Sequence, residues 1–581
     1  MVIGFAILAV QSAPSHPAVI LVEAEAFTER GGWVVDSQFM DQMGSPFLLA
    51  HGLGRPVSDA ATQVLVRAAG DYRVWVRTRD WVAPWGAPGA PGRFQVVVNG
   101  EPLGTTFGTE GAEWHWQDGG TVALPNGLTR ITLHDLTGFE GRCDAIVFSA
   151  DPSFVPPPEP AELAAFREAH GGVSHTVREG GHFDLVVVGG GIAGMCASLV
   201  AARHGLTVAL VQDRPVLGGN NSSEVRVWLG GETGLEPYPR IGDVVRELEP
   251  KQRAQPGPAE YYEDDRRLAL VGSEPNIRLL LNYRANRVRT DAGRIRFVTA
   301  QHTITGERVR LNGKWFADCT GDGTIGYLAG ADYEITLQGH MGPSDMWSIA
   351  DTGAPSPFPR CPWAFDLTSR PIPPKLGEWF WESGFDRDPI AEAERIRDNN
   401  LRAMYGAWDA LKNVRGEYPT YRLEWAAYVA GKRESRRLMG DIVLTQEDIL
   451  SNRAFVDAAV PATWMIDLHL PDPRYAQGFE GDEFISEARY TRYTPPYWVP
   501  YRCLYSRNIA NLFMAGRDIS VTHEALGAVR VQRTCGMMGE VVGMAASLCR
   551  KHRTSPRGVF EAHLSELQEL MRRGGAGPAP R

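Results

Sequence analysis

Apolar and polar residues alternate in short runs over residues 20–150, and Gly, Pro and Asn separate the runs. Alternation with a period of two places successive side chains on opposite faces of a strand, and turn residues at this spacing are typical of short antiparallel strands. Val98-Asn99-Gly100 is a strong hairpin signal. The pattern therefore predicts an all-β sandwich, with strands at residues 63–67, 72–78, 93–98, 120–124, 130–133 and 145–149.

The pattern changes beyond this region. A proline-rich stretch at residues 154–160 and a helix-forming stretch at 161–170 lead into a short apolar run, residues 185–188, that ends in glycines. A helix-forming stretch that ends at Gly205 and a second apolar run at 207–211 follow. Strand, helix and strand within about 30 residues form a βαβ unit, which is typical of α/β folds with a parallel sheet.

Gly189, Gly191 and Gly194 join the first strand of this unit to its helix, and Ile192 and Ala193 complete the turn. In a dinucleotide site the first glycine allows a tight turn and the second lets the backbone approach a pyrophosphate. The third lets helix and strand pack closely, while the helix N-terminus faces the phosphate charge. The spacing therefore predicts dinucleotide binding at this turn.

The second strand of the unit departs from the usual pattern at its end. An acidic residue about 20 positions past the glycines normally binds the ribose hydroxyls. Gln212 stands in that place and Asp213 follows it. We therefore expect the ribose contact to be displaced or to be made by an amide.

At 581 residues the chain exceeds one typical hydrophobic core, so we expect two or more domains. Residues 2–10 are apolar but no Lys or Arg precedes them, so export and a cytoplasmic location both stay open, and the run is too short to span a bilayer. We predict the following segments: a possible leader at 1–20, the β-sandwich at 21–152, a linker at 153–180, an α/β domain at 181–560 with an inserted substrate lobe at about 332–500, and a tail at 561–581.

Composition excludes several classes of function. The net charge of −10 offers no basic surface for nucleic acid, and 43% hydrophobic and 22% charged residues describe an ordinary globular protein. The seven cysteines are scattered without a C-x-x-C pair. Neither a zinc site nor a disulfide framework is indicated, and we expect buried thiols.

The segment after the βαβ unit points to the kind of dinucleotide. Gly218-Gly219-Asn220-Asn221-Ser222 resembles the glycine doublet that flavoproteins of the glutathione-reductase and succinate-dehydrogenase type place beside the pyrophosphate and the isoalloxazine. Glycines there allow close backbone approach, and Asn220 and Ser222 supply neutral hydrogen-bonding groups.

A second literal match to G-x-G-x-x-G lies at residues 321–326, after an apolar run at 314–317. The next strand-like run begins at residue 333, which leaves too little room for a βαβ crossover. Gly321 and Asp322 instead resemble the Ala-Thr-Gly-type motif that returns the chain to the flavin-binding strand. Because no separate NAD site is visible, oxygen, a quinone or a carrier protein is the expected electron acceptor.

Near the C-terminus, residues 511–518 form another strand that ends at Gly516 and Asp518. With the motifs above, this makes residues 181–550 resemble the FAD-dependent oxidoreductases of the two-dinucleotide-fold type. The resemblance implies an α/β flavoprotein with a Rossmann-type FAD-binding βαβ unit, FAD as cofactor, and Asp518 as a ligand of the ribityl chain. Three glycines of the following helix, predicted at 529–550, allow close approach to a ligand or to another helix.

The first segment resembles jelly-roll carbohydrate-binding modules, which begin with a Glu-Ala-Glu strand and end with an Asp-x-Ile-x-Phe-like strand. Glu23, Glu25 and Asp144 match those positions. The resemblance implies that these carboxylates hold a structural Ca²⁺, whereas the alternative is strand-end carboxylates in water. Aromatic residues of this segment could stack on sugar rings or belong to the core: Trp81, Trp85, Trp114 and Trp116.

Oxidation of a C–H bond by flavin needs a base, and histidine suits that role near neutral pH. His523 follows the predicted ribityl-binding strand, and Asp467 and His469 alternate on a strand so that both can point to one face. Arg530 and Arg533 could stabilise an anionic ring or hold a carboxylate. The arginine-rich residues 433–437, which include Glu434, are more typical of an ion-paired surface or interface than of substrate binding.

Three functions remain open from the sequence. The first is FAD-dependent oxidation of a carbinol carbon in a sugar or polyol derivative. The second is flavin-dependent reduction of an unsaturated carboxylate, which paired arginines would suit. The third is glycan binding with a flavin fold that is not catalytic.

Overall fold

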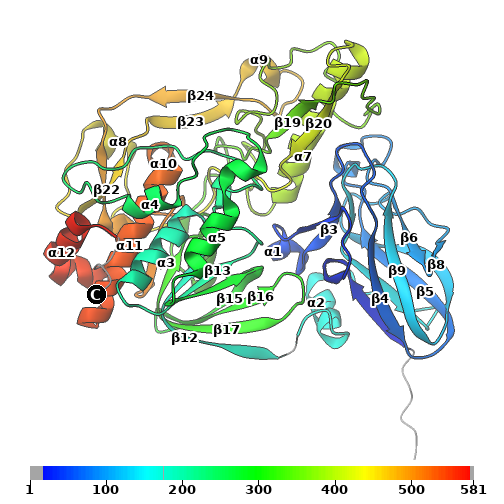
Figure 1. Cartoon of the computed structure of the whole chain (residues 1–581), viewed down its shortest axis with the longest axis horizontal. Coiled ribbons are helices and arrows are strands. Elements are labelled where there is room, and N and C mark those ends of the chain that lie inside the picture. Colours follow the sequence, from blue (N-terminus) through cyan, green and yellow to red (C-terminus); the bar gives the residue numbers. More distant parts are fainter. Residues whose placement is uncertain (1–17, 175, 576–581) are drawn as a thin grey trace, which may run out of the picture. The chain divides into compact units, whose positions relative to one another are not determined.

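The computed structural model describes residues 18–174 and 176–575. The described chain divides into two compact units (Figure 1). The first comprises residues 18–35, 47–86 and 90–173, and the second comprises residues 36–46, 87–89 and 174–575. Most of the predicted leader lies outside the described residues.

The first unit is an antiparallel β-sandwich, as the alternation predicts. Residues from both large sheets, among them Val74, Phe148, Val96 and Ile131, share one buried core. One sheet has the order β1 (Val19–Glu23), β11 (Ala145–Ser149), β5 (Gly70–Thr78), β8 (His115–Leu124), and the other has β4 (Ala60–Val66), β9 (Gly127–Asp135), β6 (Phe94–Val98), β7 (Glu101–Pro102). A small third sheet has the order β10 (Gly141–Cys143), β3 (Phe47–Ala50), β2 (Val34–Asp36).

Helix α2 (Pro160–Ala169) completes this unit, although it falls in the predicted linker. Its Leu163 and Phe166 pack with Trp75 and Trp116 on a second apolar cluster that includes β11. Trp116 is 9% exposed and donates its indole N–H to the Pro157 carbonyl at 3.1 Å. Trp81 is also fully buried. These two tryptophans therefore belong to the core and offer no face for stacking on a sugar.

The second unit is built on a sheet of seven strands, five of them parallel. Its order is β14 (Ile277–Leu281), β13 (Val208–Gln212), β12 (Val177–Val188), β17 (Arg308–Asp318), β16 (Arg294–His302), β15 (Tyr283–Asp291), with β26 (Leu512–Met514) also paired to β17. Helix α3 (Ile192–Arg203) joins β12 to β13, which gives the predicted βαβ unit. Strand β12 starts well before the predicted position because it pairs with β17 along its length.

Helix α11 (Gln532–His552) packs against α3 through its glycines. A Cβ atom at Gly539 would lie 2.1 Å from the Ala193 carbonyl oxygen, and one at Gly543 would lie 2.8 Å from that of Ala197. The glycines thus serve the approach of two helices. The helix predicted at 529–550 corresponds to α11, and a separate short helix, α10 (His523–Val529), precedes it.

Helix α12 (Pro556–Arg573) occupies much of the predicted tail. Its Val559, Leu567 and Met571 are fully buried, so this segment packs as part of the second unit. Shorter helices of this unit are α1 (Met40–Met43), α4 (Asp243–Leu248), α5 (Asp264–Gly272) and α6 (Thr324–Ala329). All seven cysteines are buried and free.

The predicted lobe consists of two-stranded sheets and helices (Figure 1, yellow-green to orange). Its elements are β18 (Tyr333–Glu334) with β21 (Arg437–Leu438), β19 (Trp347–Asp351) with β20 (Tyr421–Ala426), β22 (Ala458–Ala462) with β25 (Tyr497–Pro500), β23 (Ile466–Pro471) with β24 (Ser486–Thr491), and helices α7 (Ala393–Asp409), α8 (Gln446–Leu450) and α9 (Pro473–Ala476). Across residues 18–174 and 176–575, no helix has both the length and the apolar character that crossing a membrane requires.

Candidate functional site

A cavity of about 390 Å³ opens beside the glycine turn in the second unit. Strand and loop ends of the sheet and residues of the lobe form its wall. The predicted residues that line it are Gly189, Gly191, Ile192, Ala193, Gln212, Asp213, Gly218, Gly219, Asn220, Gly321, Asp322, Gly516, Asp467, His469 and Arg530. Those that do not are Gly194, Ser222, Asp518, His523 and Arg533.

The three glycines of the turn have different surroundings. A Cβ at Gly189, whose φ is +105°, would lie 2.2 Å from the Cys319 carbonyl oxygen, and one at Gly194 would lie 1.8 Å from that of Gly189. A Cβ at Gly191 would have no neighbour closer than Gly219 Cα at 4.0 Å. Gly189 and Gly194 thus permit tight packing of the turn, whereas a side chain at Gly191 would project into the cavity.

Both polar atoms of the Gln212 side chain already bind backbone groups of neighbouring loops, so this residue presents no free amide to the cavity. Its Oε1 accepts the Gly190 backbone N–H at 2.8 Å, and its Nε2 donates to the Val216 carbonyl at 3.2 Å. Asp213 pairs with Arg284 at 2.9 Å. Any contact between these residues and a ribose would therefore compete with existing bonds.

The second glycine pair adjoins the first turn, since Gly218 forms a bridge with Gly191. Gly218 and Gly219 have φ of +118° and +59°, in the left-handed region that favours glycine. Asn220 donates its side-chain N–H to the Lys432 carbonyl at 2.9 Å. Ser222 lies behind the wall and donates to the Gly219 carbonyl at 2.7 Å.

Gly321 and Asp322 follow β17, next to the glycine turn. Helix α6 ends only four residues before β18, which agrees with the absence of a βαβ crossover here. Asp322 lies 2.7 Å from Lys432 Nζ. Burial raises the pKa of Asp322, but the charges of Lys432 and Arg517 outweigh it and hold the pKa well below the usual range. Asp322 is therefore an anion.

Strand β23 brings Asp467 and His469 to the cavity together, as their alternation predicts. His469 Nδ1 lies 2.7 Å from Glu382 Oε1, and its Nε2 lies 3.3 Å from Asp467 Oδ1. The imidazole also packs against the Trp379 ring, with centroids 4.9 Å apart. Two carboxylates and one indole thus fix the orientation of this histidine.

Arginines flank the same group. Arg530 Nη2 lies 3.2 Å from Asp467 Oδ2, and Arg433 Nη2 lies 2.7 Å from Glu382 Oε1. Burial raises the pKa of Asp467, but the hydrogen bond with His469 and the charge of Arg530 outweigh it and hold the pKa well below its usual range. Asp467 is therefore ionised, and each arginine has a carboxylate partner.

The arginine-rich segment is ion-paired, as predicted, but it is buried and does not form an exposed surface. Arg433, Glu434 and Arg437 are 8%, 1% and 2% exposed, and Arg433 lines the cavity. A residue about 50 positions earlier supplies a counter-charge: Glu382, which is fully buried, pairs with Arg433. No sequence signal marks Glu382, because its partners Arg433 and His469 are more than 50 positions away.

The remaining predicted residues are not among those that line the cavity. His523 Nδ1 is 2.8 Å from Glu434 Oε2, and Arg533 pairs with Glu249. Asp518 is fully buried, and its pKa is raised well above the usual range by burial and by the neighbouring Asp318. At this strand end Arg517 lines the cavity in place of Asp518.

Sequence reasoning also missed residues 36–46, which lie among the sandwich strands in sequence but belong to the second unit. Gln38 and Phe39 line the cavity. Gln38 donates to the Tyr428 carbonyl at 2.8 Å and accepts the Ala430 N–H at 3.0 Å. Asp36 lies 2.9 Å from Arg397 Nη1, and both side chains are fully buried.

We expect Asp36→Ala to lower the free energy of unfolding by about 3–5 kcal/mol, because it removes one carboxylate partner of a buried guanidinium. Asp41→Ala is the matched control: Asp41 pairs with Arg284 at 2.7 Å but is 33% exposed, so about 1 kcal/mol or less is expected. Urea unfolding of both variants measures the difference. If both variants lost the same free energy of unfolding, the buried Asp36–Arg397 pair would contribute no more to stability than the exposed Asp41–Arg284 pair, contrary to this prediction.

Two groups of side chains in the described residues have the composition of a metal site. Glu23, Glu25 and Asp144 of the first unit lie together, as predicted, with ligand atoms within 4.8 Å of one another. The second group, which sequence reasoning did not single out, is His552, His563 and Glu566.

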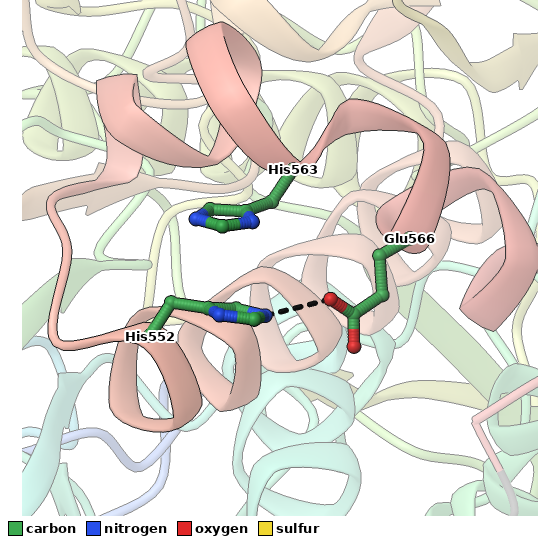
Figure 2. Close-up of side chains that lie close together, drawn as sticks. All are labelled: His552, His563 and Glu566. Carbon is green, nitrogen blue, oxygen red and sulfur yellow. Dashed lines mark hydrogen bonds and ion pairs between the residues drawn. The ribbon is translucent and has the colours of Figure 1, made fainter.

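Figure 2 shows the histidine group. The rings of His552 and His563 stack face to face, with centroids 3.8 Å apart and an angle of 10° between planes. His552 Nε2 lies 2.6 Å from Glu566 Oε2, and Lys551 also pairs with Glu566. Ring nitrogens bind a metal in the plane of the ring, so two stacked rings do not converge on one ion as they stand.

Comparison with known proteins identifies the larger part of the chain. The family model described as "FAD dependent oxidoreductase" matches residues 184–348 and 360–571. Glycerol-3-phosphate dehydrogenase of Mycobacterium leprae (strain TN) is 44% identical over 54 residues, which is 9% of this chain and 9% of that protein. Glycerol-3-phosphate dehydrogenase 2 of Mycobacterium tuberculosis (strain ATCC 25618 / H37Rv) matches to the same extent.

Three solved structures are similar to this chain at low sequence identity. The Mycobacterium smegmatis Sdh1 complex in the apo form has a TM-score of 0.30 and 14% identity, with coverage of 68% of this chain and 76% of that chain. A family 35 carbohydrate binding module from Clostridium thermocellum has a TM-score of 0.19 and 16% identity, with coverage of 22% and 97%. The Bacillus halodurans glycerol-3-phosphate dehydrogenase complexed with FAD has a TM-score of 0.21 and 16% identity, with coverage of 32% and 42%.

Proposed function

This chain belongs to the FAD dependent oxidoreductase family, and from the residues that the lobe adds to the cavity we propose that it oxidises a carbinol carbon of a sugar or polyol derivative. The observation that carries the proposal is the buried Asp467–His469 pair on the cavity wall. The electron acceptor that we propose is oxygen, a quinone or a carrier protein.

Family membership makes FAD the cofactor, and the glycine turn fits its pyrophosphate. Gly191 leaves open space at the cavity wall that a side chain would fill, and Gly218 and Gly219 line the same wall. The N-terminus of α3 begins beside them at Ile192. Bound FAD supplies a ring that accepts a hydride. The chain itself must orient the substrate and take the proton of its hydroxyl group.

His469 suits the proton-accepting role. Its Nδ1 faces Glu382, which fixes the ring, and its Nε2 is directed toward Asp467 at the cavity. In the neutral ring the proton sits on Nδ1 toward Glu382, and Nε2 keeps its lone pair. A carbinol O–H placed between Nε2 and Asp467 would transfer its proton to Nε2, and ionised Asp467 would accept the new N–H of the imidazolium. The charge created by proton transfer is thus balanced inside the site.

The other groups on this wall suit a neutral, hydroxyl-rich ring. Trp228, Trp379 and Trp464 line the cavity, and indole faces pack well against the apolar face of a sugar ring. Ser344 and Tyr490 add hydroxyl groups that can donate and accept hydrogen bonds.

The alternative enzymatic function is the reduction of an unsaturated carboxylate. The arginines at the cavity give this alternative little support, because they are already paired. Arg433 is paired with Glu382 and Arg530 with Asp467. Because each cation already has an internal carboxylate partner, binding of an anion would have to break an existing pair. Glycan binding without catalysis is set aside, because the family is one of oxidoreductases.

We expect anaerobic addition of a sugar or polyol to bleach the visible flavin absorption of the purified protein. The panel should include glycerol 3-phosphate, because relatives that match over 54 residues carry its name. Fumarate added to the dithionite-reduced protein tests the reductase alternative. Reoxidation by fumarate, with no bleaching by any hydroxylic compound, would overturn the proposal.

A further inference from the structure

A guanidinium group lies inside the acidic cluster of the first unit. Arg167, on helix α2, is 2% exposed. Its Nη1 lies 2.5 Å from Glu23 Oε2, and its Nη2 lies 2.6 Å from Asp144 Oδ2. The two nitrogens therefore bridge the first and the last of the three carboxylates.

These positions are the ones that a bridging calcium ion would need. Ca²⁺ binds carboxylate oxygens at about 2.3–2.6 Å. Nitrogen atoms already lie 2.5 and 2.6 Å from Glu23 Oε2 and Asp144 Oδ2. An ion bound to both oxygens would overlap the guanidinium, so the Ca²⁺ implied by the resemblance does not fit while Arg167 is in place.

Asp144 and Glu23 each have a further close neighbour. Arg77 Nη1 also lies 2.6 Å from Asp144 Oδ2 and brings a second positive charge. The chain after α2 returns over Glu23, where a Cβ at Gly172 would lie only 2.1 Å from Glu23 Oε1. Backbone thus covers the second oxygen of Glu23 and leaves little room for an ion and its water ligands.

Helix α2 is held in this position by packing that does not depend on charge. Leu163 and Phe166 join Trp75 and Trp116 in the apolar cluster next to β11. Arg167 follows Phe166 directly, so burial of the helix carries its guanidinium to the carboxylates.

We infer that Arg167 takes the place of a bound cation in this cluster, so that the β-sandwich is completed by its own helix α2 and not by calcium. Buried carboxylates need positive charge nearby, and an arginine on the same chain supplies it without a metal. The sandwich and α2 then form one structural module that is indifferent to chelators.

The test compares the full-length protein with Arg167→Met by calorimetric calcium titration and by thermal unfolding. For the wild type we expect no binding of Ca²⁺ and one melting temperature with calcium or with EDTA. For Arg167→Met we expect a melting temperature lower by roughly 10 °C, because two buried carboxylates lose a partner. If CaCl₂ restores the melting temperature of Arg167→Met, the freed carboxylate oxygens can bind the metal. That result would support the inference that Arg167 takes the place of a cation.

Arg73→Met is the matched control, since Arg73 pairs with Asp118 in the same unit but both side chains are about one third exposed or more, at 36% and 43%. It should melt like the wild type. Stoichiometric calcium binding that stabilises the wild type would overturn the inference, and so would an Arg167→Met protein that melts at the wild-type temperature. The wild-type titration decides the point even if Arg167→Met does not fold.

Discussion

Purified Gly191→Glu protein is expected to contain no FAD while it keeps its fold. The backbone at Gly191 has φ of −67° and ψ of −178°, which any residue adopts, so glutamate introduces no backbone strain. Its Cβ would have no neighbour closer than 4.0 Å, and its carboxylate would project into the cavity at the N-terminus of α3. A negative charge there occupies the place of the pyrophosphate and repels it.

Absorbance of the purified protein at flavin wavelengths measures this loss, and far-UV circular dichroism checks the fold. Gly272→Glu is the matched control, because Gly272 is exposed at the end of α5 and a Cβ there meets nothing within 4 Å. It should bind FAD like the wild type. A Gly191→Glu protein with full flavin occupancy would remove this turn from the cofactor site.

Substitution of His469 by alanine is expected to slow substrate-dependent flavin reduction by about 100- to 10,000-fold, the usual contribution of a general base. FAD content should not change, because His469 lies on the lobe and not on the glycine turn. Stopped-flow measurement under anaerobic conditions, with the compound that bleaches the flavin, gives the rate.

His523→Ala is the informative comparison. Both histidines contact a buried glutamate, Glu382 for His469 and Glu434 for His523, but only His469 lines the cavity. The sequence placed His523 first because it follows the predicted ribityl-binding strand. If His469 alone is the base, His523→Ala should slow flavin reduction far less than His469→Ala does. If His469→Ala reduces its flavin at the wild-type rate, His469 is not the base.

The features that the sequence predicted well are those set by local chemistry. Strand alternation and turn residues determined the sandwich, and the spacing of Gly189, Gly191 and Gly194 determined the βαβ turn. In each case the signal lies within one strand or one turn, although the strands that pair can be far apart in sequence, as β1 is from β11. Backbone sterics and side-chain periodicity over such short spans are legible without any knowledge of distant contacts.

Contacts between distant segments could not be predicted in this way. Arg433 resembles a surface residue until the lobe places Glu382 beside it, and Gln38 lies among sandwich strands in sequence although it lines the cavity. A charged or amide side chain looks the same in sequence whether it is solvated or paired, because its environment comes from other segments.

The sequence by itself determined a flavoprotein preceded by a β-sandwich, since glycine spacing and strand alternation are local requirements of those folds. Tertiary structure decided which polar groups meet: it brought His469 to the cavity wall with Asp467 and beside Glu382, left His523 outside the cavity lining, and placed Arg167 among the carboxylates predicted to bind calcium. The physical reason is that charge, burial and hydrogen-bond partners belong to a three-dimensional environment, and packing of remote elements creates that environment only when the chain has folded.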